Sequence, residues 1–61
     1  MKKKQYSEYL KTLSHHDLIA EACDNFGFYE QAEFYPEEAL LALCLDSLKY
    51  VHEEDEINVV E

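Results

Sequence analysis

Two cysteines and three histidines are the side chains that could serve as nucleophiles or metal ligands: Cys23, Cys44, His15, His16 and His52. None shows the C-x-x-C or H-x-x-x-H spacing of a metal site. Both cysteines fall in apolar stripes, where burial raises the pKa of a thiol and makes it inert. The single glycine cannot build a phosphate-binding loop. We therefore expect no metal, no cofactor, no catalytic residue and no enzymatic activity.

Carboxylates dominate the remaining polar chemistry. Fourteen Asp and Glu face five Lys and no Arg, which gives a formal net charge of −9. The imbalance is uneven, because residues 1–11 carry four Lys against one Glu, whereas the rest of the chain carries one Lys against 13 acids. The sequence lacks the basic face that nucleic-acid binding requires, and no apolar stretch approaches the roughly 20 residues of a membrane span. Neither nucleic acid nor a membrane is an expected direct partner.

The spacing of the acids predicts a charged surface. Asp17, Glu21 and Asp24 stand at i, i+4 and i+7, which places all three on one helix face opposite the apolar face. A second acidic segment follows, in which acids are mixed with aromatic residues: Tyr29, Glu30, Glu33 and Phe34. Carboxylates at this spacing resemble a phosphate backbone and would fit a basic groove on another protein. Exposed aromatic residues suit a protein interface in which aromatic side chains are the anchors and polar residues form the rim.

These patterns predict a small acidic protein-binding module. The leading hypothesis is an inhibitor that mimics nucleic acid and occupies a basic site on a nucleic-acid-binding protein, a type associated with phages and mobile elements acting against host defence. The residues expected to contact the partner are Asp17, Glu21, Asp24, Tyr29, Glu30, Glu33 and Phe34. Two simpler interpretations stay open: an acidic face that only confers solubility, and aromatic residues that only cover the core. A third assigns Lys2–Lys4 and Lys11 to contacts with anionic lipid or nucleic acid.

Two helices are predicted before the chain's only glycine. Residues 3–13 carry an apolar stripe at i, i+3, i+4 and i+7, made by Tyr6, Tyr9, Leu10 and Leu13. Ser14 is placed to cap a second helix, residues 15–26, with Asp17 in a variant of the capping box. Gly27 follows where a helix C-terminus favours positive φ, so the second helix should end there.

An aromatic connector, residues 28–35, should form a short helical turn or an irregular segment. Pro36 suits position N1 of a last helix, residues 36–52, whose central run is apolar on every side. Either a second protein chain or the aromatic connector should therefore cover part of this helix. Four acids at residues 53–56 disfavour a helix C-terminus, and residues 57–60 should either dock in an extended conformation or be disordered.

The expected fold is therefore an all-α bundle of about three helices in one small domain, residues 1–61, with an acidic tail at 53–61. The alternative function is a structural or regulatory helical subunit, antitoxin-like or an adaptor. It would act through an apolar homodimer or hetero-oligomer interface formed by Leu40, Leu43 and Tyr50. The first residues lack the apolar segment of a secretory signal, so a cytoplasmic location is expected, the host cytoplasm if a phage encodes the protein.

Overall fold

The computed structural model describes residues 1–60, so the last residue of the predicted tail, Glu61, lies outside the described residues. The helices in chain order are α1 (Lys3–Lys11), α2 (His15–Phe26), α3 (Tyr29–Phe34), α4 (Glu37–Ser47) and a 3₁₀-helix, η1 (Leu48–Tyr50). This small helical bundle confirms the predicted fold class. Within residues 1–60, no helix combines the length and apolar character needed to cross a bilayer.

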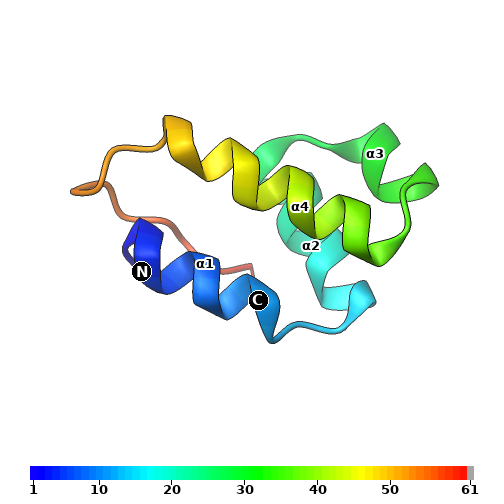
Figure 1. Cartoon of the computed structure of the whole chain (residues 1–61), viewed down its shortest axis with the longest axis horizontal. Coiled ribbons are helices and arrows are strands. Elements are labelled where there is room, and N and C mark those ends of the chain that lie inside the picture. The colour runs from blue at the N-terminus through cyan, green and yellow to red at the C-terminus, as the bar shows by residue number, and fades with distance from the viewer. Residues whose placement is uncertain (61) are drawn as a thin grey trace.

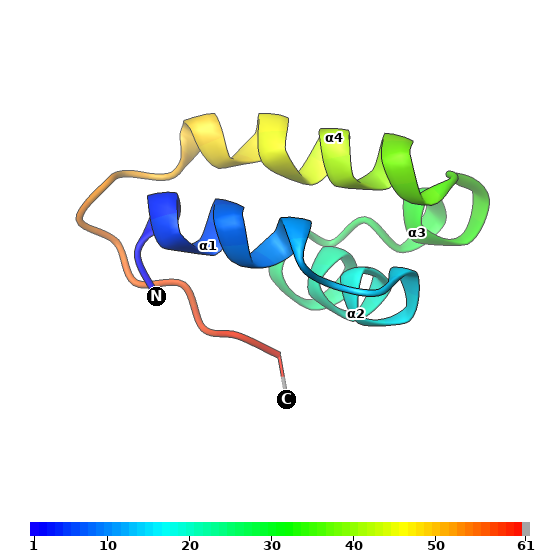
Figure 2. The same ribbon diagram turned by 60° about the horizontal axis from the view of Figure 1, so that its bottom comes forward.

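The bundle is built around α4. Figures 1 and 2 show α1 and α4 running side by side in opposite directions, with α3 at one end of the molecule and the turn into the tail at the other. Helix α2 packs against both α3 and α4, and α1 packs against α4. Each helix places at least one residue in the core, which consists of Tyr6, Leu10, Leu18, Ala22, Ala32, Leu40, Cys44 and Leu48.

The boundaries of α2 follow the local sequence. The Ser14 Oγ accepts a hydrogen bond from the Asp17 backbone N–H at 3.2 Å, as the cap predicts. At the other end Gly27 has φ +72°, and its N–H donates to the Cys23 carbonyl at 3.0 Å. Only glycine adopts this left-handed conformation without steric cost, so the predicted end of the helix is confirmed.

Helix α4 differs from its predicted span of 36–52 at both ends. Pro36 has ψ 162° and is the N-cap rather than the first helical residue, and its carbonyl accepts from the Leu40 N–H at 3.0 Å. The α-helix ends at Ser47, η1 adds one turn, and Val51 is extended. The chain therefore leaves the helical conformation before the acidic run at residues 53–56, and the tail that follows turns back toward α1 (Figure 2).

The tail is docked rather than disordered, so the first of the two predicted alternatives is right for the described residues. The Ile57 N–H donates to the Met1 carbonyl at 2.8 Å. Farther along, the Asn58 carbonyl accepts from Asn25 Nδ2 and the Val60 N–H donates to Glu21 Oε2, both at 2.9 Å. Figure 2 shows the tail passing the start of α1 on its way to the C-terminus.

Candidate functional site

One side of α3 carries the exposed aromatic and acidic side chains that the sequence singles out. Tyr29 is 65% exposed and Phe34 is 76% exposed, and Glu30 and Glu33 are exposed beside them. Residues three and four apart in a helix are neighbours, so the pairs 29–33, 30–33 and 30–34 lie close together. We call these four residues the acidic-aromatic surface.

Packing on the opposite side of α3 determines which residues face outward. Ala32 is buried, and the ring of Phe28 stacks on that of Phe26 with centroids 5.6 Å apart. The Ala32 N–H donates to the Phe28 carbonyl at 2.9 Å, which starts the short helix. The connector therefore contributes Ala32 to the core and packs the partly buried Phe28 against it, while Tyr29 and Phe34 remain in solvent.

The charge of this surface is not neutralised within the described chain. Among residues 1–60, the acids that form ion pairs are Glu8, Asp46 and Glu56, and none belongs to the acidic-aromatic surface. Residues 12–48 contain no Lys or Arg. All five lysines instead line a groove between α1 and the end of α4. Negative potential consequently persists around α3, where it can steer a cationic partner.

The two ends of the predicted α2 acidic face are exposed, but its centre is not. Asp17 and Asp24 face solvent, whereas Glu21 is only 2% exposed, so its assignment to an exposed acidic face is wrong. Glu21 Oε1 accepts from the Tyr6 hydroxyl at 2.5 Å and from Asn25 Nδ2 at 2.9 Å. Its other oxygen accepts from the Val60 N–H. Glu21 therefore joins α1, α2 and the tail.

A signal for this contact exists in the sequence. Tyr6 belongs to the apolar stripe of α1, and a buried tyrosine hydroxyl requires a hydrogen-bond partner. Glu21 follows Leu18 by three residues, at the edge of the apolar face of α2, and Asn25 is one turn farther on. Burial and the hydrogen bond to Glu21 both raise the pKa of the Tyr6 hydroxyl, so it stays protonated and donates.

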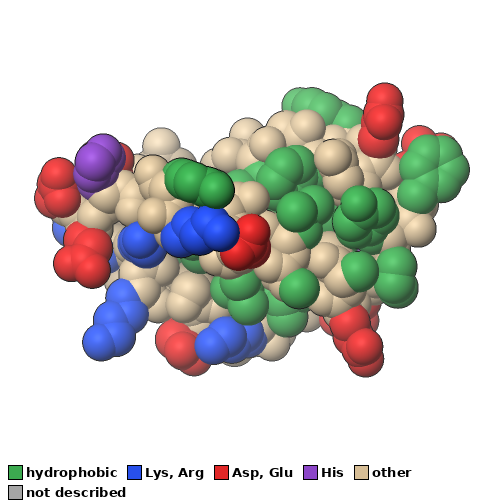
Figure 3. Space-filling model, turned by 45° about the horizontal axis from the view of Figure 1, so that its top comes forward, with side chains coloured by type: hydrophobic (Ala, Val, Ile, Leu, Met, Phe, Trp, Pro, Cys, Tyr) green, Lys and Arg blue, Asp and Glu red, His purple; other side chains and the backbone are tan. Residues whose placement is uncertain are grey.

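The predicted oligomer interface, which spans α4 and η1, is also partly internal. Leu40 is 0% exposed in the chain's own core, which excludes it from an exposed interface, and Leu43 is half-buried. Tyr50 is 78% exposed, with the Lys49 ammonium 5.3 Å from the centre of its ring. In Figure 3, hydrophobic side chains gather over the half of the molecule that contains α3, whereas blue lysine side chains lie in the other half.

The potential nucleophiles and ligands are dispersed. Cys23 and Cys44 are free thiols, and burial, followed by the negative charge of Glu21, raises the pKa of Cys44 to about 11. Across residues 1–60, no three His, Cys, Asp or Glu side chains are grouped so that they could hold a metal ion.

No protein-family model matches this sequence, and no curated protein or solved structure matches it either.

Proposed function

We propose that this chain is a small acidic protein-binding module that docks its acidic-aromatic surface on the basic, nucleic-acid-binding face of another protein and thereby blocks it. The observation that carries the proposal is that two exposed aromatic rings flank two carboxylates on one side of α3, and neither carboxylate forms an ion pair within residues 1–60. Aromatic residues are the commonest energetic anchors of protein interfaces, and leaving such rings in water brings no benefit to folding.

The carboxylates give the surface its preference for a basic partner. Glu30 and Glu33 are three residues apart on the helix, where like charges repel by a few tenths of a kcal/mol. A cationic partner relieves this repulsion, and the surrounding negative charge increases its rate of association at low salt. Asp17 and Asp24 add exposed negative charge on α2. A partner that normally binds phosphates would meet a comparable array of anions here.

Charge reversal tests the proposal. The double variant Glu30→Lys, Glu33→Lys should abolish capture of basic nucleic-acid-binding proteins from a native lysate, and wild-type capture should weaken as salt rises. The control Glu54→Lys, Asp55→Lys makes the same change in net charge in the tail, where both side chains are exposed. Circular dichroism confirms that each variant is folded. Equal capture by both double variants would refute the proposed surface.

The alternative function, a helical subunit that acts through α4 and η1, now depends on Leu43 and Tyr50, because Leu40 is internal. Exposure of the Tyr50 ring is the observation that favours it. Sedimentation at micromolar concentration distinguishes the two functions. A dimer that persists at high salt and dissociates in Tyr50→Ala would support the subunit, whereas a monomer would disfavour the homodimer form of it.

A further inference from the structure

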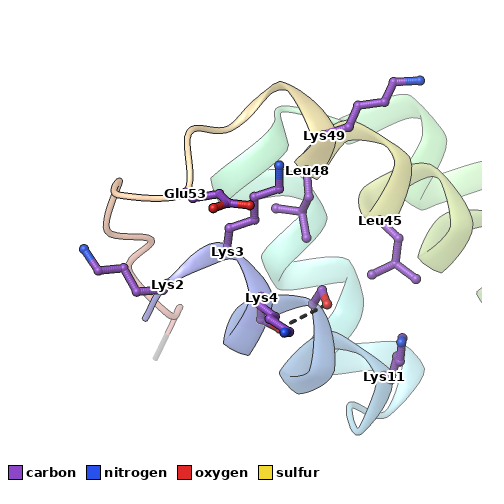
Figure 4. A pocket seen from close by; sticks show the side chains of 9 residues that line it. Lys2, Lys3, Lys4, Lys11, Leu45, Leu48, Lys49 and Glu53 are labelled. Carbon is purple, nitrogen blue, oxygen red and sulfur yellow. Dashed lines mark hydrogen bonds between the residues drawn. The ribbon is translucent and has the colours of Figure 1, made fainter.

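The groove between α1 and the end of α4 gathers every lysine of the chain. It has a volume of about 740 Å³, and Leu45 and Leu48 line it together with the five lysines. Figure 4 shows Lys3, Lys4 and Lys11 on the α1 side and Lys49 with the two leucines on the α4 side. In a protein of net charge −9, this concentration of positive charge next to apolar side chains is a separate feature from the acidic-aromatic surface.

The five lysine ammonium groups differ in how many hydrogen bonds and ion pairs they form within residues 1–60. Lys2 and Lys3 bind the tail, because Lys2 Nζ donates to the Glu54 carbonyl at 2.6 Å and Lys3 Nζ donates to the Val51 carbonyl at 3.0 Å. Lys11 and Lys49 form exposed ion pairs with acids three residues away, at 3.3 Å and 3.1 Å. Exposed pairs of this kind are weak and exchange readily with other anions. Within residues 1–60, the Lys4 ammonium makes no hydrogen bond or ion pair, so it is free to bind an anion.

The dimensions of the groove limit the size of the anion. Lys4 and Lys11 are seven residues apart on α1, which corresponds to about 10 Å along the helix. Glu53 lines the groove, and Glu54 and Asp55 follow it in the exposed part of the tail. A long polyanion such as duplex DNA, or an anionic membrane, would extend beyond the lysines and meet these carboxylates. A compact anion that fits between the two helices would meet at most Glu53, which lines the groove, and would not reach Glu54 or Asp55.

We propose that this groove binds a free, compact amphiphilic anion, with a carboxylate or phosphate head group held by Lys4 and neighbouring lysines and a short hydrocarbon body against the half-buried Leu45 and the small exposed part of the core residue Leu48. The volume lies within the roughly 300–1,000 Å³ of small-molecule sites. The lysine heads supply charge-assisted hydrogen bonds, and the leucine side chains favour a ligand with an apolar part over an inorganic ion.

Titration with octanoate, followed through the methyl NMR signals of the full chain, tests this site. Saturable shifts should be strongest at Leu45 and Leu48. Octanol, which has the chain without the charge, and acetate, which has the charge without the chain, should each bind more weakly than octanoate. Octanol binding as well as octanoate would overturn the proposal, and so would octanoate shifts that leave both leucines unaffected.

A matched pair of variants isolates the role of Lys4. Lys4→Gln and Gln5→Glu change the net charge by the same one unit on adjacent exposed positions of α1, but Gln5 does not line the groove. Lys4→Gln should weaken octanoate binding about threefold, as expected for one exposed ion pair, and Gln5→Glu should leave it unchanged. Equal weakening by both variants, or tighter binding of duplex DNA or of phosphatidylserine vesicles at the same leucines, would contradict the proposal.

Discussion

At the scale of single residues, Glu21 has the role most different from its apparent place in the sequence. Spacing alone groups it with Asp17 and Asp24. However, a side chain at the edge of the apolar face can point into the core when buried polar groups there can form hydrogen bonds with it. The Tyr6 hydroxyl, Asn25 and the Val60 N–H supply those partners. Two of them come from distant parts of the chain, so the contact depends on tertiary packing that local spacing does not encode.

Removal of the Glu21 carboxylate should therefore destabilise the fold. Glu21→Ala leaves the buried Tyr6 hydroxyl and the partly buried Val60 N–H without their acceptor. The buried hydroxyl alone should cost about 1–3 kcal/mol. Urea unfolding measures the loss. The exposed Asp24→Ala should change the free energy of unfolding by less than about 0.5 kcal/mol. If Glu21→Ala does not fold, Glu21→Gln provides the comparison, and a Gln variant as stable as wild type would contradict this account.

Glu56 makes docking of the tail dependent on pH. Hydrogen bonds from the Met1 amine and from Lys2 hold the pKa of its carboxyl below the ordinary value. A lowered folded-state pKa means that the stabilisation is complete above the ordinary carboxyl pKa and disappears as pH falls through the lowered one. Protection of the Ile57 amide against hydrogen exchange should accordingly fall in acid. Glu56→Gln should have weaker protection at neutral pH and a flatter pH profile; a profile identical to wild type would refute this role.

At the scale of elements, helix starts and stops with local causes could be predicted, and those with tertiary causes could not. The cap at Ser14 and the positive φ of Gly27 involve only neighbouring residues, so both ends of α2 were predictable. The apolar pattern of α4 continues past Ser47, and only the tail, which turns back toward α1, shows why the chain becomes extended at Val51. The helical form of the connector likewise depends on burial of Ala32 and Phe28 against α2.

Substitution of Gly27 tests the local cause directly. A Cβ at this position meets no atom within 4 Å, so the cost of Gly27→Ala comes from the backbone conformation alone. We expect a loss of about 1 kcal/mol in the free energy of unfolding, and a smaller loss for Gly27→Asn, because asparagine tolerates the left-handed region better. Thermal and urea unfolding measure both. An alanine variant as stable as wild type would contradict the argument.

Alanine substitutions of Leu40 and Leu43, the two leucines assigned to an α4 interface, should differ in their effect on the free energy of unfolding. Leu40→Ala opens a cavity in the core and should cost about 2–5 kcal/mol, and it should do so at every protein concentration. Leu43→Ala removes a half-buried side chain and should cost less. Unfolding measured over a range of concentrations checks this. The free energy of unfolding of the wild type could instead rise with protein concentration, while that of Leu43→Ala does not. This result would show that α4 associates with another copy of the chain.

At the scale of the whole molecule, the main feature is the separation of charge. The excess of acids over lysines after residue 11 predicted an anionic surface, and Asp17, Asp24, Glu30 and Glu33 are indeed exposed and without ion pairs in the described chain. That Lys49 lines the same groove as the lysines of α1 was not predictable, because this placement depends on the antiparallel packing of α1 and α4. The sequence thus predicted the composition of the surface but not the groove.

At this scale we propose that the acidic-aromatic surface occupies the nucleic-acid site of a basic partner protein. The most direct test of this proposal places a photo-crosslinking amino acid at Phe34, identifies the proteins captured from a native lysate, and measures whether duplex DNA and this chain bind the captured protein at the same time. We predict that duplex DNA and this chain compete for the captured protein, and that the double variant Glu30→Lys, Glu33→Lys no longer displaces the DNA. A stable ternary complex with duplex DNA, or undiminished competition by the double variant, would contradict the claim.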